Sequence, residues 1–339
     1  MKVFLLAITA ALAIASGLYM MSDAEGSTRL LVTDSAIEAS WASWRAKYGK
    51  TYGTSSDETY RKQVFTKWYH FVTKHNATPG VTFTMALNPY ADLTHEEFLA
   101  QKANLPQREA APEVNTVVGD DVVPASLDWR AKGVFNPIKN QGQCGSCWAF
   151  SAIGAMEALW YMENKKHMSF SEQQMVDCVP WSDGCNGGWM DYVFHYAKSV
   201  PFVSEKDYPY KAVDQKCQTN HTGIAKVASY TPRSAFTDEN AFLAEVQRQP
   251  QSIALYADER FQMYWHGIIG DDNGKCSGLG ETNHAVMAVG WETDSIIIRN
   301  SWGDQWGEKG YIRLTRGDGS RKVGTCSLRS NVTAPKAFA

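Results

Sequence analysis

The ten residues 141–150, QGQCGSCWAF, limit how this 339-residue chain can fold more strongly than any other segment. They place two cysteines, Cys144 and Cys147, three positions apart on a glycine-rich stretch that leads into an apolar run. Apolar residues then recur at positions 149, 153, 156 and 159, which is the spacing of a buried helix face. Cys147 is therefore expected in the first turn of a buried helix, where the helix dipole and unpaired N–H groups stabilise a thiolate.

The same segment contains Cys-Gly-Ser-Cys-Trp, which matches the nucleophile signature C-G-[SA]-C-[WY] of papain and the cathepsins. On these residues the chain resembles the papain-like cysteine proteases. The resemblance implies that Cys147 is the nucleophile. It also implies an α+β, two-domain fold, with a helical left domain, a β-barrel-like right domain and the active-site cleft between them. The helical half is expected over about residues 133–230, and the β-rich half over about residues 231–331.

The chain has an odd number of cysteines, which suggests one free thiol. Six cysteines can pair in about 15 ways, so the spacing alone leaves the pairing open. The resemblance implies three disulfides and leaves Cys147 free. The pairs are Cys144–Cys185, Cys178–Cys217 and Cys276–Cys326.

Two other interpretations of the cysteines are weaker. Buried thiols of a cytosolic protein would fit the count, but the N-terminal segment indicates an oxidising compartment. A redox or zinc role for the Cys144/Cys147 pair would need a thioredoxin-like α/β unit or a second C-x-x-C motif, and the sequence contains neither. No metal or organic cofactor is expected, because the resemblance implies acyl transfer that uses side chains alone.

Residues 3–15, VFLLAITAALAIA, form a short apolar run behind Lys2, and Ala13 and Ala15 have the A-x-A spacing of a cleavage site. This predicts a signal peptide over residues 1–17 and entry into the secretory pathway, to a lysosome-like compartment or the extracellular space. A membrane anchor is the alternative, because weak apolar character continues to Met21. The A-x-A spacing favours cleavage, after which no stable membrane association is expected.

The formal net charge of -3 and the lack of a basic run argue against a nucleic-acid partner. The residues after the signal peptide are enough for about two domains. The expected partners are protein and peptide substrates and the chain's own prosegment, and a monomer is expected.

Residues 34–76 carry two helix-like patterns, one of which places Trp41, Trp44 and Tyr48 on a single face. The second pattern resembles the cathepsin L-type propeptide motif Glu-x3-Arg-x3-Phe-x2-Asn-x3-Ile-x3-Asn, with three departures. Its residues are Asp57, Arg61, Phe65, Trp68, Val72 and Asn76, of which Asp57, Trp68 and Val72 depart from the motif. Asn88, Tyr90 and Asp92 resemble the second propeptide motif, in which Ala86 and Tyr90 replace Gly and Phe.

An inhibitory, helical propeptide is therefore expected over residues 18–121, and residues 122–339 are expected to form the peptidase domain, whose start resembles the family in PASLDWRAKG. Residues 99–121 are interpreted as a linker arm. Seven acidic residues lie between positions 92 and 121, which suggests that the arm crosses the cleft and that protonation of its carboxylates weakens docking. An ordinary solvated linker is the alternative. The acids are Asp92, Glu96, Glu97, Glu109, Glu113, Asp120 and Asp121.

His284 is the candidate base and Asn300 its candidate partner. They lie 137 and 153 residues beyond Cys147, close to the roughly 130–150 residues typical of this family. The apolar run that follows His284 predicts a buried strand that leads away from the site. The other histidines lie in no comparable motif; they are His70, His75, His95, His167, His195, His221 and His266.

The resemblance assigns a role to each of these residues. Cys147 attacks the scissile carbonyl, and His284 protonates the leaving amine and then activates water. Asn300 orients the imidazole, Trp302 shields the contact between Asn300 and His284 from water, and Gln141 donates to the oxyanion together with the backbone N–H of Cys147.

The loop GCNGG at 184–188 resembles a substrate-binding loop of the family, in which Gly187 and Gly188 let the substrate backbone approach closely. The pocket for the residue two before the scissile bond is expected to prefer apolar or aromatic side chains. Its walls are expected from Trp189, Met190, Ala254, Thr282, Ala285 and Asn331.

Three glycosylation sequons begin at Asn76, Asn220 and Asn331. Asn220 is the best surface candidate, and a glycan on Asn76 would leave with the prosegment. Asn331 is expected to be unmodified, because a glycan at the floor of the pocket would block substrate.

The leading hypothesis is a cathepsin L-type cysteine endopeptidase made as a zymogen. A non-catalytic binding relative would be expected to lack the nucleophile, yet Cys147, His284, Asn300 and Gln141 are all present. A transglutaminase-like acyl-transfer enzyme would also use cysteine and histidine, but such chains differ outside the two residues.

Overall fold

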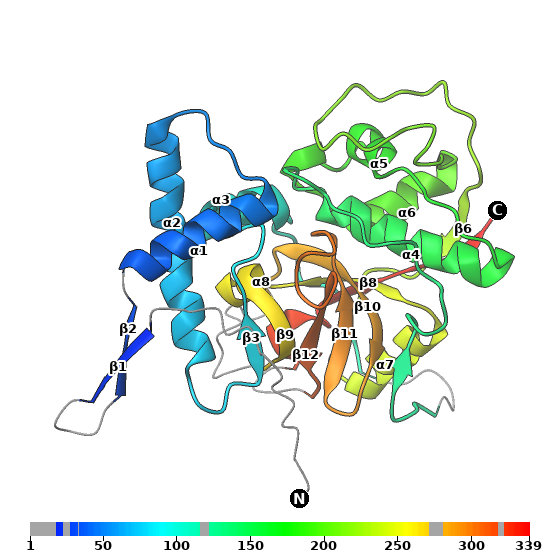
Figure 1. Ribbon diagram of the computed structural model, residues 1–339. Helices are drawn as coiled ribbons and strands as arrows, with labels where there is room; N and C mark the ends of the chain where they lie inside the picture. The colour runs from blue at the N-terminus through cyan, green and yellow to red at the C-terminus, as the bar shows by residue number, and fades with distance from the viewer. Residues whose placement is uncertain (1–17, 23–27, 33, 116–121, 271–280, 318–321) are drawn as a thin grey trace, which may run out of the picture. The chain divides into compact units, whose positions relative to one another are not determined.

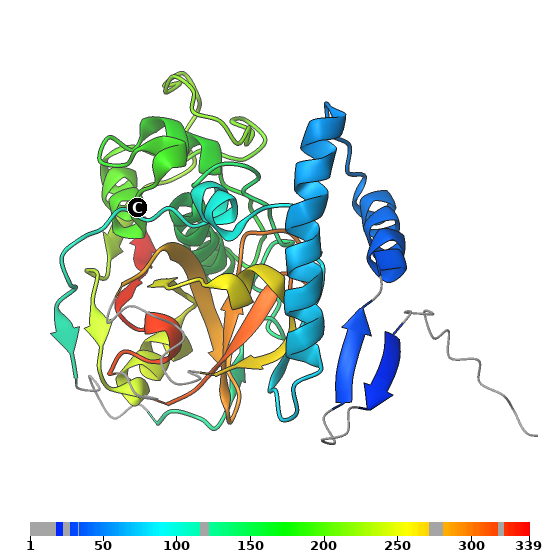
Figure 2. The same ribbon diagram turned by 90° about the vertical axis from the view of Figure 1, so that its left-hand side faces the viewer.

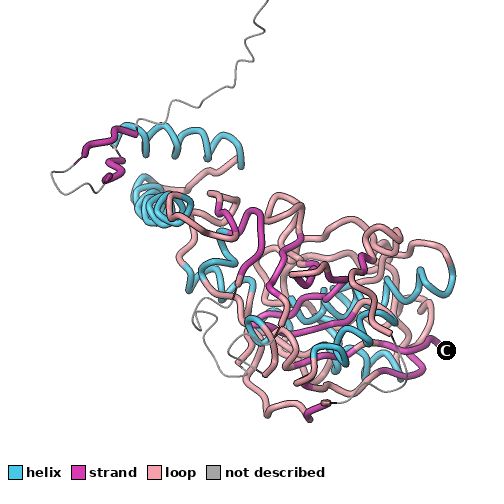
Figure 3. The backbone as a smooth tube through the Cα atoms, turned by 90° about the horizontal axis from the view of Figure 1, so that it is seen from below, coloured by secondary structure: helices cyan, strands magenta, loops and turns pink. Residues whose placement is uncertain are grey.

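The structure is a computed structural model that describes residues 18–22, 28–32, 34–115, 122–270, 281–317 and 322–339 (Figure 1). The chain forms two compact units, residues 1–70 and 71–339. The predicted signal peptide, residues 1–17, lies outside the described residues. Among the described residues, no helix is both long and apolar enough to cross a membrane. Figure 3 shows the chain coloured by secondary structure.

The first unit contains an antiparallel pair of strands, β1 (Leu18–Ser22) and β2 (Thr28–Val32), followed by α1 (Asp34–Tyr48) and most of α2 (Ser55–Asn76). Both predicted helices are confirmed. Their aromatic faces explain why they form: Trp41 stacks on Trp44 at 5.5 Å, and Phe65 of α2 lies 5.2 Å from each of these rings.

The second unit begins with the rest of the prosegment, which supplies β3 (Phe83–Met85), α3 (His95–Lys102) and β4 (Glu113–Val114). The Thr94 hydroxyl and the Glu97 carboxylate form a capping box that starts α3. The prediction of a linker from residue 99 was wrong at its start, because α3 continues to Lys102 and Leu105 is buried beyond it. Buried side chains here hold the chain against the mature domain.

The helical half of the mature part contains α4 (Cys147–Asn164), α5 (Glu172–Cys178), the short helix η1 (Gly184–Asn186) and α6 (Met190–Ser199). These helices lie together in Figure 1. Residues of α4 are buried on most of its circumference, because other helices and the sheet surround it. Two hydrogen bonds join α4 to the sheet: Ser151 Oγ donates to the Val286 carbonyl (2.7 Å), and Ser252 Oγ donates to the Ser151 carbonyl (2.9 Å).

The β-rich half is built on one sheet with the strand order β13-β8-β10-β11-β12-β9-β3, and β5 (Leu127–Asp128) also pairs with β10. The prosegment thus contributes an edge strand, β3, to a sheet of the mature part. The other strands are β8 (Gln251–Leu255), β9 (Tyr264–Ile269), β10 (His284–Trp291), β11 (Ser295–Arg299), β12 (Tyr311–Thr315) and β13 (Asn331–Thr333). Two helices accompany it, α7 (Glu239–Arg248) and α8 (Glu259–Met263).

The C-terminal strand β14 (Pro335–Phe338) returns to the helical half and pairs with β6 (Val227–Tyr230) (Figure 1 and Figure 2). Phe338 packs 5.6 Å from the ring of Trp160 and 5.4 Å from that of Phe202. This contact ties the two halves of the mature part together through the end of the chain.

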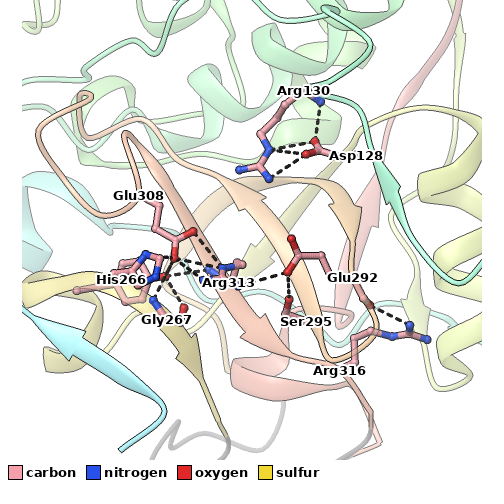
Figure 4. Close-up of polar contacts among 10 residues, drawn as sticks. Asp128, Arg130, His266, Gly267, Glu292, Ser295, Glu308, Arg313 and Arg316 are labelled. Atoms are coloured by element: carbon pink, nitrogen blue, oxygen red, sulfur yellow. Dashed lines mark hydrogen bonds and ion pairs between the residues drawn. The ribbon is translucent and has the colours of Figure 1, made fainter.

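An ionic network supports the sheet edge on which the prosegment pairs (Figure 4). The Glu308 carboxylate accepts hydrogen bonds from the Gly267 backbone N–H (3.0 Å) and from the Arg313 guanidinium (2.8 Å), which also reaches Glu292. Gly267 lies in β9 opposite Phe83 of β3. Glu308, a residue of the mature part, therefore stabilises β9, the strand on which β3 of the prosegment pairs.

Candidate active site

Cys147 is the first residue of α4, and it is the free cysteine among the described residues. The loop before it is held by the Gly145 backbone N–H, which donates to the Cys185 carbonyl at 2.8 Å. A Cβ atom at position 145 would lie 2.4 Å from that carbonyl oxygen, so only glycine fits. The glycine therefore fixes the position of the helix start relative to the loop at Cys185.

His284 opens β10, and Asn300 follows the last residue of β11. His284 Nε2 donates to Asn300 Oδ1 at 2.8 Å, and both side chains are buried. The Trp302 ring stacks on the imidazole at 4.5 Å and is buried as well. His284 Nδ1 has no hydrogen-bond partner in the described part of the chain, so this nitrogen remains available for proton transfer.

The packing of α4 on β10 brings Cys147 to this histidine. The backbone N–H of Ala285, the residue after His284, acts on the Cys147 sulfur and favours its thiolate. Residues separated by 137 positions in the sequence are thus adjacent in the fold.

The Gln141 side-chain amide is held from both sides. Its Oε1 accepts from Ser301 Oγ (2.8 Å), and its Nε2 donates to the carbonyls of Cys144 (2.9 Å) and Lys102 (3.1 Å). Ser301 had not been singled out from the sequence, although its position directly after Asn300 could have suggested a role. The Lys102 carbonyl belongs to the prosegment. A peptide carbonyl of the chain itself therefore already accepts a hydrogen bond from the Gln141 amide.

Burial dominates the electrostatics of the two central residues. It raises the pKa of Cys147 to about 11, although the backbone N–H groups of Ala285 and Asn104 favour the thiolate. Burial also lowers the pKa of His284 to about 4, against the opposing effects of Asn300 and the Lys102 carbonyl. With the prosegment in place, the thiol and the imidazole are therefore both neutral, and the thiolate expected from the helix dipole is not favoured.

Residues 102–106 of the prosegment lie directly over this site. The Leu105 N–H donates to the Asn283 carbonyl (3.1 Å), and Trp189 Nε1 donates to the Pro106 carbonyl (3.2 Å). Gly187 allows the closest approach, because a Cβ atom there would lie 2.0 Å from the Asn104 carbonyl oxygen. Gly188 is buried beside Trp148, and an added Cβ would overlap with Ser182 Oγ at 2.4 Å and with the Trp148 ring at 2.7 Å.

The residues predicted to form the apolar pocket lie close together. Ala285, Ala254 and Asn331 form one row across β10, β8 and β13. Leu105 of the prosegment is buried in the same apolar cluster as Met190, Ala254 and Ala285. Beyond Leu105, prosegment residues 106–111 and Glu113 line a cavity of about 450 Å³, which is also lined by Trp189, Thr282 and Asn331.

A cation near this pocket had not been predicted. The Arg233 guanidinium donates to Asn331 Oδ1 and lies 5.3 Å from the centre of the Trp189 ring. Lys322 also lines the cavity. No sequence pattern connects Arg233 with Asn331, because the two residues meet only through the pairing of Ser234 with Val332.

The second prosegment motif lies against Trp302. Tyr90 Oη donates to the Trp302 carbonyl (2.7 Å), and the Phe98 ring of α3 meets the Trp302 ring edge-on at 4.8 Å. Asn88 Oδ1 accepts from the Tyr90 N–H (3.0 Å) and fixes the turn between them. The prosegment therefore contacts the same tryptophan that covers His284.

In the described part of the arm, Glu109 and Glu113 are exposed, and the Glu109 carboxylate interacts through space with Arg233 of the mature part. Asp120 and Asp121 lie outside the described residues, so docking through the arm's carboxylates stays a prediction. A basic residue of the arm, Arg108, forms an ion pair with the mature part, because its guanidinium lies 2.8 Å from the Asp191 carboxylate. The alternative of a solvated linker is wrong for residues 102–105, which are mostly buried.

Two disulfides join Cys144 to Cys185 and Cys178 to Cys217, the pairs that the resemblance implies. Cys326 is also disulfide-bonded, and Cys276, its predicted partner, lies outside the described residues.

The three sequons differ in their surroundings. Asn220 is exposed, whereas Asn331 is buried and its amide also donates to Ser330 Oγ (3.0 Å). Asn76 is exposed, but its amide bonds the Met85 backbone N–H and carbonyl, both at 2.9 Å.

Over the described residues, no group of histidine, cysteine, aspartate and glutamate side chains is arranged to hold a metal ion.

Comparison with known proteins identifies two family models in this chain. Residues 123–336 match the papain family cysteine protease model, and residues 41–98 match the cathepsin propeptide inhibitor domain. A cathepsin L-like proteinase of Fasciola hepatica is 37% identical over 303 residues, which cover 86% of this chain and 91% of the relative. Ananain of Ananas comosus is 36% identical over 303 residues, covering 86% of each chain.

Solved structures of precursors have the same fold. The digestive procathepsin L2 proteinase of Tenebrio molitor larval midgut matches with a TM-score of 0.81 and 32% identity, covering 89% of this chain and 100% of that one. A recombinant stem bromelain precursor matches with a TM-score of 0.79 and 33% identity, over 88% and 98% of the two chains. These matches confirm the predicted fold class with its helical propeptide.

Proposed function

The chain belongs to the papain family of cysteine proteases, and on this premise we propose that it is a zymogen whose mature form cleaves peptide bonds through Cys147 and His284. The observation that carries the proposal is the buried pair of His284 and Asn300 beneath Trp302, next to the free cysteine at the start of α4. The proposed peptidase domain covers residues 122–339, and the proposed propeptide covers residues 18–121.

The proposed reaction has two stages. The Cys147 thiolate attacks the scissile carbonyl, the His284 imidazolium gives its proton to the leaving amine, and a thioester remains. Water then gives a proton to His284 and attacks the thioester, which releases the carboxylic acid and restores the thiolate–imidazolium pair.

Gln141 and the backbone N–H of Cys147 are proposed to stabilise the oxyanion. The hydrogen bond from Gln141 Nε2 to the Lys102 carbonyl supports this role, because it places the amide in contact with a peptide carbonyl next to the dyad. Asn300 is proposed to orient the ring of His284, and Trp302 to exclude water from their contact.

The proposed pocket accepts an apolar or aromatic side chain two residues before the scissile bond. Leu105 supports this, because the prosegment places a leucine in the apolar cluster that contains Met190, Ala254 and Ala285. Gly187 and Gly188 would then let the substrate backbone lie as close as the Asn104 carbonyl does here.

Several properties of the whole protein follow as proposals. We expect secretion or delivery to a lysosome-like compartment after signal cleavage, a monomeric mature enzyme and a glycan on the exposed Asn220. Cys276 and Cys326 are proposed to form the third disulfide.

The test is hydrolysis of a fluorogenic peptide amide with leucine two before the cleaved bond, by thiol-reduced protein from which the prosegment has been removed. The Cys147→Ala variant is processed by an added protease and measured beside it. We expect activity in the first protein and none in the second. Absence of activity in both, with intact mass showing that the prosegment is gone, would refute the proposed function.

A further inference from the structure

One arginine of the prosegment, Arg108, is exposed to solvent on one side and contacts the mature part on the other. One nitrogen of the Arg108 guanidinium lies 2.8 Å and 3.0 Å from the two carboxylate oxygens of Asp191. The guanidinium carbon lies 4.5 Å from the centre of the Tyr192 ring and 5.5 Å from that of Trp189. A carboxylate and two aromatic faces thus contact a single cationic group.

These three contacts come from one rigid element. Trp189 is the N-cap of α6, and Asp191 and Tyr192 lie in its first turn. The helix dipole favours a negative charge at this end, where the Asp191 carboxylate lies. All three residues belong to α6 or its N-cap, so the mature part supplies every group that contacts the Arg108 guanidinium here.

Asp191 has no ion-pair partner in the described mature residues. Its side chain is 14% exposed, and the ion pair that it forms is the one with Arg108. Arg233 lies nearby and interacts with Asp191 through space, but its guanidinium is held by Asn331 Oδ1 and the Glu109 carbonyl. Removal of the prosegment would therefore leave the Asp191 carboxylate without its ion-pair partner, beside two aromatic rings that also favour a cation.

We propose that the mature enzyme has a subsite for an arginine side chain, formed by Asp191, Tyr192 and Trp189. This inference rests on the proposed endopeptidase function and specifies its substrates. Arg108 occupies the subsite in the zymogen, so the prosegment imitates a substrate side chain there.

The path of the prosegment places the subsite along the cleft. Leu105 is buried in the apolar cluster that contains Cys147 and Met190, the Pro106 carbonyl accepts from Trp189, and Arg108 lies beyond Trp189. The acyl part of a substrate has its scissile carbonyl at Cys147, so residues farther from Cys147 on this side lie toward the substrate's N-terminus. The selected arginine is therefore three or four residues before the scissile bond.

The test compares peptides that share leucine two before the scissile bond and differ at the next two positions. Arginine is compared with citrulline, which has the same shape without the charge, and with an alanine reference peptide. We expect arginine at one of the two positions to raise kcat/KM about 10-fold over citrulline, as a charge-assisted, partly solvated contact would.

The same ratio is measured for Asp191→Asn and for Asp294→Asn, a control that changes an exposed carboxylate at the turn between β10 and β11. We expect the preference for arginine to fall to about 2-fold or less in Asp191→Asn and to persist in Asp294→Asn. Because the ratio is taken within one enzyme, a general loss of folding or activity cancels.

Three results would overturn the inference. Equal cleavage of arginine and citrulline peptides by an enzyme that cleaves the alanine reference would refute the subsite and leave the proposed function intact. A preference for arginine that survives in Asp191→Asn would assign it to another group. Failure to cleave any peptide, the reference included, would refute the proposed function itself.

Discussion

At the scale of single residues, Asn300 determines what His284 can do. Its Oδ1 accepts from His284 Nε2 at 2.8 Å, which fixes the ring and leaves Nδ1 without a partner among the described residues. The same hydrogen bond raises the pKa of His284 against the effect of burial. Asn300 therefore favours the protonated imidazole that the proposed mechanism requires.

We expect Asn300→Ala to lower kcat by about 10- to 100-fold with little change in KM, because a hydrogen bond to a charged group contributes about 1.5–3 kcal/mol. Loss of the bond lowers the pKa of His284, so the alkaline limb of the pH–rate profile moves to lower pH. The measurement is a pH profile of peptide hydrolysis, with Asn164→Ala, an exposed asparagine of α4, as control. An unchanged profile would show that Asn300 has no such role.

A second residue-scale feature lies away from the dyad. Lys139 Nζ bonds both Glu157 (2.8 Å) and Glu172 (2.7 Å), and Glu205 lies close by. Burial raises the pKa of Glu172, Lys139 opposes the rise, and Glu157 adds to it. One lysine is thus shared by two buried carboxylates with a half-buried one close by, which favours retention of a proton in the folded state.

This network predicts a fold that is more stable in acid. A carboxyl whose pKa is higher in the folded than in the unfolded state adds to the free energy of unfolding at low pH. This contribution is lost as the pH rises from about 4.3, the unfolded pKa, through the folded pKa. The free energy of unfolding then falls by at most about 1.4 kcal/mol per pH unit. We expect Glu172→Gln to flatten the fall in Tm between pH 5 and pH 8. Calorimetry in the inactive Cys147→Ala background measures it, and Glu259→Gln, at an exposed position, should leave the slope unchanged.

At the scale of secondary-structure elements, α3 connects the prosegment to the site. The Thr94–Glu97 capping box starts the helix, and Phe98 is 0% exposed against Trp302. The helix therefore packs on Trp302, which in turn stacks on His284. The helix ends at Lys102, whose carbonyl accepts a hydrogen bond from Gln141. A short helix thus places a peptide carbonyl at the proposed oxyanion site.

We expect Phe98→Ala to loosen this helix, because removal of a buried phenylalanine costs about 3–5 kcal/mol. The prosegment should then be lost at least about 10-fold faster at a given acidic pH. Intact mass against time measures the loss, with Glu96→Ala, an exposed position of the same helix, as control. Equal rates for the two variants would show that α3 does not limit release of the prosegment.

At the scale of the whole molecule, packing of the precursor changes the protonation of the site. Burial raises the pKa of Cys147 to about 11 and lowers that of His284 to about 4 in the structure that includes the prosegment. The covered dyad is therefore neutral. In the proposed function, the zymogen would therefore be restrained both by exclusion of substrate and by loss of the reactive thiolate.

This predicts that Cys147 reacts with iodoacetamide at least about 100-fold faster at pH 7 once the prosegment is removed, because the thiolate is the reactive species. Mass spectrometry of unreduced protein measures the labelling, and Cys147→Ala should take up no label. Similar labelling rates before and after removal would contradict the burial of the dyad.

The sequence by itself determined the local parts of this protein. The helix start at Cys147, the strand that leads from His284 and the two prosegment helices follow from short-range spacing, which reflects which faces are buried. The resemblance also named Gln141, Asn300 and the pairs Cys144–Cys185 and Cys178–Cys217, because its motifs consist of residues close together in the chain.

Only the tertiary structure decided the contacts between distant segments. The Lys102 carbonyl on Gln141, Arg233 on Asn331 and Arg108 on Asp191 each join parts of the chain that share no periodic pattern. Their meeting depends on sheet register and on the path of the prosegment over the site. The raised pKa of Cys147 has the same origin, because burial is a property of the packed chain and not of the residues next to the cysteine.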